Sequence, residues 1–168
     1  MTIQTNAADI VTVSAMGQVA NPSLSGLPAE PYRLDADGKA FLWPTFGGIV
    51  YNVSVGDSAF GWVGDCIHPS VSIAHSDANK NRGLNVFACI GNDAMITSGA
   101  AKGARGVVTG KSGRFSDQVI IHFDVETRRK LAVDDQILVK SEGVGLAVPD
   151  CPDVAFKSLS PHLFDALP

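Results

Sequence analysis

A glycine-rich segment from residue 56 to 75 carries the side chains best suited to acid–base chemistry. Asp65 and His68 lie close together in it, and a carboxylate beside an imidazole can exchange protons near neutral pH. Gly64 permits a sharp turn before the pair, and Pro69 biases His68 towards an extended backbone. We therefore predict that Asp65 is a general base, that His68 is its partner or acid, and that both side chains lie in one concave pocket.

The same segment allows other interpretations. Trp62 is expected to wall the pocket, but it would serve equally as a core residue, with Asp65 in an ordinary Gly-Asp turn. As a metal site, Asp65, His68 and His75 would offer a carboxylate and two imidazoles, which suit zinc or iron. Their spacing matches no standard ligand pattern, so the sequence indicates no particular cofactor.

Polar side chains flank the apolar run LNVFACIG at residues 84–91, which has the composition of a buried strand. Arg82 precedes this run and is expected to hold a substrate carboxylate or phosphate, or else to be a surface cation. Asn85 is expected either to orient the substrate or to bracket the fold through hydrogen bonds, and Asn92 is expected to contact the substrate. On a strand, Asn85 and Cys89 would face the same side.

The cysteines Cys66, Cys89 and Cys151 stand at wide spacing and form no C-x-x-C pair. This pattern argues against a disulfide framework or a thiolate zinc site, so we expect reduced thiols. Cys89 is a candidate nucleophile, with His68 or His75 as its base. Its apolar neighbours favour a buried, inert thiol instead.

The composition is that of a globular domain with many turns. Of 168 residues, 45% are hydrophobic and 18% are charged, and the chain has 17 glycines and 9 prolines. These values exclude a disordered chain, a charged coiled coil and a histone-like polycation. The net charge of −4 argues against nucleic-acid binding. Because neither a signal peptide nor a membrane-spanning run is recognisable, we expect a cytoplasmic protein without a membrane partner.

Period-two alternation and glycine turns predict a mainly β fold. We expect strands at 8–15, 49–55, 84–91, 93–99, 105–113, 118–124 and 136–143. A short helix is expected within 125–135, a helical turn near the C-terminus, and long loops at 20–48 and 56–83.

These elements predict a single compact domain over residues 1–168. Its architecture is expected to be a small SH3-like barrel or antiparallel sheet, with extra strands, long loops and one or two short helices. The SH3-like subdomain would span about 91–148, and a docking tail would follow at 149–168.

Residues 91–110, GNDAMITSGAAKGARGVVTG, resemble a KOW motif, the short segment found in SH3-like barrels of ribosomal proteins and transcription factors. Glycines at the turns permit positive φ between two apolar strands. A basic cluster lies on this expected hairpin and just after it, formed by Lys102, Arg105, Lys111 and Arg114. It would suit a phosphate backbone, but few aromatic residues are interleaved for base stacking, and a solvated hairpin edge explains it equally well.

A longer resemblance covers residues 47 to about 146. GGI-x-YNV at 47–53, GD-x-AFGW-x-GD at 56–65 and LN-x-x-ACIGN at 84–92 resemble an uncharacterised bacterial and archaeal family, a domain of unknown function. The resemblance implies no particular reaction. Family chains are usually longer, with a second half, which implies that a shared site would be completed here by self-association. Cys66 stands where the family pattern has a histidine, so a ligand role there does not carry over.

We expect an enzyme that acts on a small polar metabolite (an amide, an amino acid or a related carbonyl compound) by hydrolysis or proton transfer. In this interpretation Trp62, Arg82, Asn85 and Asn92 contact the substrate. The alternatives are a KOW-like RNA- or protein-binding module and a structural subunit of a homo-oligomer. The expected partners are a small-molecule ligand and further copies of the chain.

Overall fold

The computed structural model describes residues 3–22, 32–34, 36–42, 47–51, 68–113 and 117–168. Its helices and strands follow the chain as η1 (a 3-10 helix, Ala7–Asp9), β1 (Val13–Val19), β2 (Tyr32–Leu34), β3 (Ala40–Leu42), β4 (Ile49–Val50), β5 (Ser70–Ala74), α1 (Ala78–Phe87), β6 (Asp93–Ile96), β7 (Arg105–Lys111), β8 (Val119–His122), α2 (Val125–Lys130), β9 (Gln136–Ser141) and α3 (Pro161–Asp165). Among these residues, no helix is long and apolar enough to cross a membrane.

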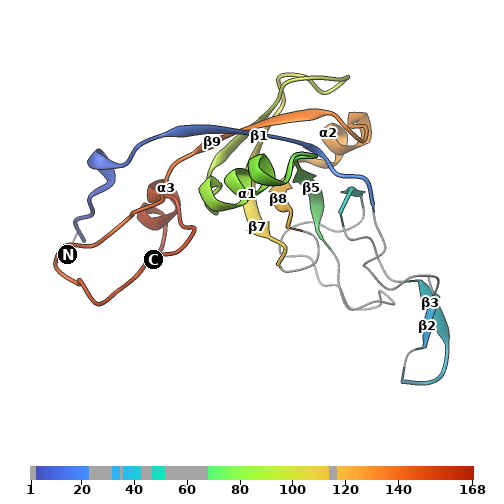
Figure 1. Ribbon diagram of the computed structural model, residues 1–168, viewed down its shortest axis with the longest axis horizontal. Helices are drawn as coiled ribbons and strands as arrows, with labels where there is room; N and C mark the ends of the chain where they lie inside the picture. Colours follow the sequence, from blue (N-terminus) through green and yellow to red (C-terminus); the bar gives the residue numbers. More distant parts are fainter. Residues whose placement is uncertain (1–2, 23–31, 35, 43–46, 52–67, 114–116) are drawn as a thin grey trace.

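The main sheet closes on itself as an antiparallel barrel (Figure 1). Its strand order is β1-β9-β6-β7-β8-β5-β4, and an added pairing of β1 with β5 closes the ring and leaves β4 outside it. Closure removes the exposed edges that an open sheet would present to other chains. The prediction of a mainly β fold with few short helices is therefore confirmed.

The barrel interior is built from the inward-facing side chains of alternating strand positions. In β9 the buried positions alternate with more exposed ones, so that Ile137, Val139 and Ser141 face inwards. Helix α1 packs so closely on β1 that a Cβ atom added at Gly17 would lie only 2.8 Å from Cδ2 of Leu84. Gly17 therefore provides the room that the helix needs.

The prediction of a strand at 84–91 is wrong, because residues 78–87 form helix α1. The Asp77 side chain caps this helix by accepting hydrogen bonds from the backbone N–H groups of Asn79 and Lys80. The cap starts the helix before the apolar run, and the helical conformation continues to Phe87. The inference that Asn85 and Cys89 share one strand face is therefore also wrong.

The predicted long loops contain regular structure as well. β5 lies within 56–83, where Ser70–Ala74 forms a central strand between β8 and the β4 and β1 edges. β2 and β3 form a two-stranded sheet within 20–48. The first barrel strand, expected at 8–15, begins at Val13 and extends to Val19.

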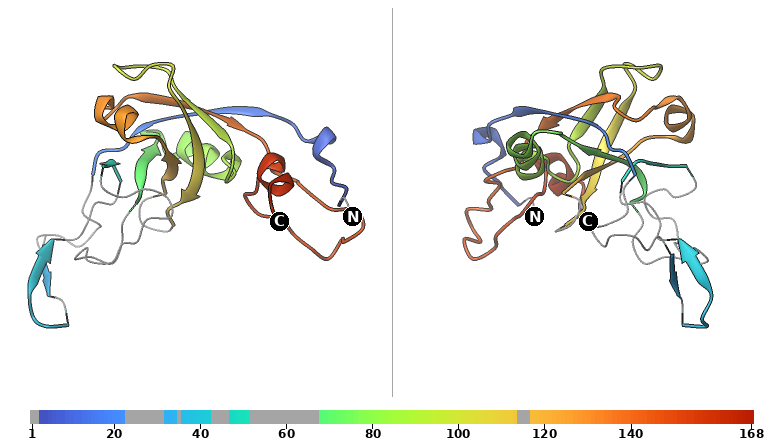
Figure 2. Two further views of the ribbon diagram at one scale, coloured as in Figure 1. Left: turned by 180° about the vertical axis from the view of Figure 1, so that it is seen from behind. Right: turned by 45° about the vertical axis from the view of Figure 1, so that its right-hand side comes forward.

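The later strands lie where the alternation predicts them, and β6 and β7 form the predicted antiparallel hairpin. The tail returns to the barrel (Figure 2). There Ile90 and Leu159 form a parallel bridge. The N-terminal segment runs beside it, since Asn6 N–H donates to the carbonyl of Ala147. Both chain ends therefore lie at the same end of the molecule (Figure 2).

Candidate functional site

His68 lies in a buried polar cluster at the start of β5. Its Nδ1 atom lies 3.2 Å from Ser72 Oγ and 3.2 Å from Gln118 Oε1. All of these side chains are buried, and Gly47 leaves room for Gln118, since a Cβ there would meet its amide at 2.6 Å. His68 is therefore anchored by groups from two neighbouring barrel strands and their approaches.

Burial lowers the pKa of His68 below its ordinary 6.5, partly opposed by the hydrogen bond to Gln118. The desolvated ring disfavours the charged form, so the imidazole is neutral at physiological pH. When Nδ1–H donates to Gln118 Oε1, the basic lone pair is on Nε2. His68 thus has the protonation state of a general base.

A second set of polar groups gathers on Asp117, which precedes Gln118. Its carbonyl oxygen accepts hydrogen bonds from Nδ2 of Asn81 at 2.9 Å and from Nδ2 of Asn85 at 2.7 Å. Asp117 has a φ of 44°, uncommon for a residue other than glycine. The two helix amides stabilise this turn by satisfying its carbonyl.

Helix α1 and Asp117 together line a cavity of about 300 Å³. Its walls are formed by Ala78, Asn81, Arg82, Asn85, Val86 and Asp117. Arg82 and Asp117 are both exposed, so the cavity offers a cation and an anion to a ligand. Its size lies at the lower end of small-molecule sites.

Three residues selected from the sequence therefore converge on one dipeptide, Asp117–Gln118. His68 contacts Gln118, Asn85 contacts Asp117, and Arg82 lines the cavity beside them. The two central residues were not predicted as site residues. One feature of the sequence could have marked Gln118 as a candidate, since it is a polar residue directly before the apolar strand VIIHF.

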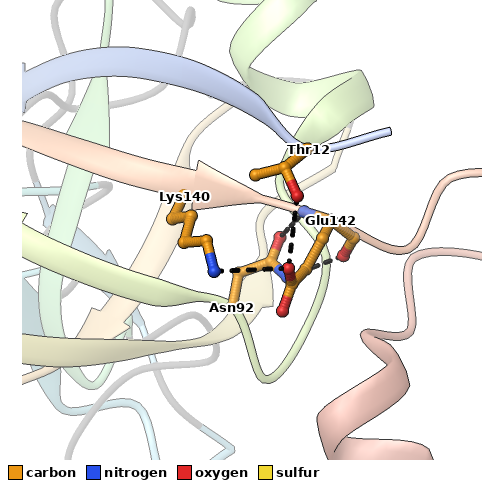
Figure 3. Close-up of polar contacts among 4 residues, drawn as sticks. All are labelled: Thr12, Asn92, Lys140 and Glu142. Carbon is orange, nitrogen blue, oxygen red and sulfur yellow. Dashed lines mark hydrogen bonds and ion pairs between the residues drawn. The ribbon is translucent and has the colours of Figure 1, made fainter. Parts of the chain in front are cut away.

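Asn92 lies apart from this group and serves the backbone instead (Figure 3). Its Oδ1 accepts from the N–H of Cys89 at 2.7 Å and of Glu142 at 3.3 Å, and its Nδ2 donates to the Glu142 carbonyl at 2.7 Å. The side chain is only 1% exposed. The sequence predicted that Asn92 contacts a substrate, whereas in the structure its amide binds the backbone of Cys89 and Glu142.

His75 is also engaged locally. Its N–H donates to Asn81 Oδ1 at 2.9 Å, and its Nδ1 accepts from the N–H of Asp77 at 3.0 Å. Within the described ranges, no group of three or more histidine, cysteine, aspartate or glutamate side chains is arranged to hold a metal. Asp65, the carboxylate of the metal alternative, lies outside the described residues, as do Trp62 and Cys66.

Cys89 is buried, and its Sγ lies 3.6 Å from the carbonyl oxygen of Phe87. Burial raises the pKa of its thiol, although the positive charge of Lys111 acts in the opposite direction. A raised pKa keeps the neutral thiol and disfavours the nucleophilic thiolate. Cys89 and Cys151 are both free thiols.

The chain is similar to a protein of known structure, the one titled "Crystal structure of TM1086". The TM-score is 0.89 at 41% identity, and the match covers 98% of this chain and 56% of that chain. The present chain thus spans little more than half the length of that relative. No curated protein matches it.

A family model matches most of the chain, from residue 32 to 165. Its description is "Domain of unknown function (DUF4438), N-terminal". The match runs from β2 to α3, with the barrel strand β1 before it, and it confirms the resemblance to an uncharacterised domain family. The chain therefore belongs to the DUF4438 family.

Proposed function

We propose that the protein is an enzyme for a small zwitterionic metabolite, an amino acid or its amide, and that it acts by hydrolysis or proton transfer. The supporting observation is the convergence of His68, Asn85 and Arg82 on Asp117–Gln118, beside a cavity of about 300 Å³. A cavity lined by an amide and by opposite charges, next to a residue with a perturbed pKa, is a candidate binding site.

The groups around the cavity match the two ends of an amino acid. The Arg82 guanidinium would bind a carboxylate in bidentate fashion. The exposed Asp117 carboxylate would pair with an ammonium group. Both hydrogen bonds of Asn85 use Nδ2, so its Oδ1 is available among the described residues to accept from a substrate N–H.

The acid–base role is assigned to His68 and Asp65. His68 is neutral near pH 7 because burial lowers its pKa, which suits a group that takes up a proton in one step and returns it in the next. Asp65 stays the proposed general base and Trp62 the proposed pocket wall. Arg82 and Asn85 would orient the substrate, whereas the hydrogen bonds of Asn92 are used by the fold.

The test combines binding with turnover. Standard amino acids and their primary amides are titrated by calorimetry, and turnover is followed as ammonia release and as exchange of the α-proton in deuterated water. Arg82→Met is expected to weaken binding at least about tenfold, because it removes a charge-assisted contact. Lys102→Met, which removes an exposed cation on the β6–β7 hairpin, is the control.

His68→Asn is expected to abolish turnover while the affinity changes little, since His68 acts on protons and not on the bound charges. Equal binding by Arg82→Met and Lys102→Met, or the absence of any bound compound from the panel, would refute this function.

Self-association is a second proposal, favoured by an apolar surface along β1. Two adjoining cavities of about 410 and 320 Å³ share Val13 and Phe87 in their walls. Val11 is 76% exposed, Val144 51% and Phe87 38%. Apolar side chains gathered in this way mark interaction surfaces.

The cytoplasmic location and the RNA- or protein-binding alternative stay predictions from the sequence.

A further inference from the structure

Lys111, at the end of β7, is partly buried, and its side chain is not ion-paired with any residue that the structure describes. Its Nζ donates a hydrogen bond to Ser158 Oγ at 2.8 Å, and no carboxylate in the described part of the chain pairs with it. Lysine is almost never fully buried without such a partner, and Lys111 is already partly withdrawn from water. An unpaired lysine beside a hydroxyl therefore needs an explanation beyond surface solvation.

The environment shifts the protonation equilibrium of Lys111 towards the neutral amine. Burial lowers the pKa of Lys111, and the Cys89 thiol lies close enough to influence it. A thiolate at Cys89 would stabilise the ammonium form, but burial raises the pKa of that thiol and keeps it uncharged. Lys111 is thus adapted to accept a proton.

Ser158 is held in an unusual backbone conformation. Its φ is 58°, in the left-handed region that residues other than glycine seldom adopt, and such strain clusters at functional positions. The side chain is half-buried, so it stays within reach of small molecules.

The hydroxyl is not needed to fasten the tail. The carbonyl of Ser158 accepts from the N–H of Ile90 at 2.8 Å, and the N–H of Ser160 donates to the carbonyl of Ile90 at 3.0 Å. Ser160 also caps α3. The backbone therefore fixes this turn, and the pairing of Ser158 Oγ with Lys111 is additional to it.

We propose that Ser158 and Lys111 form a nucleophile–base pair that takes the acyl group of small esters. Ser158 Oγ bonds to the ester carbonyl carbon as its proton passes to Lys111 Nζ. The bond from that carbon to the alcohol oxygen breaks, and Lys111 returns the proton to the departing alkoxide. Water then attacks the acyl group with Lys111 again as base, releases the carboxylic acid and restores Ser158.

This activity uses none of the residues assigned to the amino-acid site, so either proposal can fail without the other. The probe is p-nitrophenyl acetate, with p-nitrophenolate release followed by absorbance and the acetylated residue located by peptide mass spectrometry. We expect acetyl-Ser158 in the unaltered protein, formed faster as rising pH increases the neutral fraction of Lys111. Among the described residues, Cys89 is the titratable group facing Lys111.

Two variants test the roles separately. Ser158→Gly removes the hydroxyl and suits a φ of 58°, so the fold is kept while acetylation at 158 is lost. Lys111→Met keeps the aliphatic stem and should slow release at least about 100-fold, with the pH dependence removed. The controls Ser76→Ala and Lys102→Met alter exposed residues and should react like the parent.

Circular dichroism checks that each variant is folded. Acetylation of Lys111 itself, no acetylation of the parent, or equal rates in the parent and Ser158→Gly would overturn the proposal.

Discussion

The side-chain amide of Asn85 donates to the backbone carbonyl of Asp117 over 2.7 Å, although 32 positions separate the two residues in the chain. This bond joins helix α1 to the turn that enters β8. The same turn carries Gln118, whose amide oxygen contacts His68. The hydrogen bond between Asn85 and Asp117 thus links helix α1, which forms one wall of the cavity, to the segment that contacts the buried His68 imidazole.

Replacement of Asn85 by alanine should lower the free energy of unfolding by about 0.5–1.5 kcal/mol, because the carbonyl of Asp117 loses one of its two donors. Urea denaturation measures the change. Asn79→Ala is the matched control, since Asn79 is exposed on the same helix and contributes its backbone N–H to the cap. Equal losses in both variants would show that the bond to Asp117 contributes nothing specific.

Stability should fall as the pH drops below 6.5, in part through His68. Its folded pKa is lowered, so the unfolded chain binds a proton first as the pH decreases, and the unfolded state gains stability between 6.5 and the lower folded pKa. Denaturation from pH 7.5 downwards measures this slope. His68→Gln should have a shallower slope over the same window, and an unchanged slope would contradict the prediction.

Asn92→Ala should destabilise the fold without affecting ligand binding at Arg82. The substitution leaves the buried N–H of Cys89 and the backbone groups of Glu142 without partners, at a cost of about 2–4 kcal/mol. Denaturation and calorimetry separate the two effects. A folded variant with normal stability and weakened amino-acid binding would instead assign Asn92 to the substrate.

Phe87→Asp should convert an oligomer to a smaller species, because it places a charge in the apolar surface along β1. Light scattering after size exclusion measures the mass at micromolar concentration. Val133→Asp is the control, as Val133 is similarly exposed, at 41%, outside that surface. A monomeric parent protein would rule out self-association under these conditions.

RNA should not be retained at about 150 mM salt, where exposed charges are strongly screened. Lys102 and Arg105 are exposed on the β6–β7 hairpin, yet the chain carries a net charge of −4. Filter binding with a mixed single-stranded RNA provides the measurement. Retention that disappears in Lys102→Ala/Arg105→Ala would support the RNA-binding alternative.

Local sequence patterns were sufficient to predict the strands β6 to β9 and the helix α2. Their alternation, turn glycines and capping residues lie within a few positions of one another, so each segment determines its own conformation. The apolar run after Leu84 was different, since its composition suits a strand and a buried helix alike. There the Asp77 cap and packing against Gly17 favoured the helix.

The sequence by itself determined the mainly β class, the family and the residue types of the site, because these depend on composition and short patterns. Only the tertiary structure decided that β1 pairs with β5 to close the barrel, that His68 contacts Gln118, and that Asn85 contacts Asp117 beside the cavity that Arg82 lines. Such contacts join segments distant in the chain, and no local propensity encodes them. They form when burial of the shared core outweighs the entropy lost in bringing those segments together.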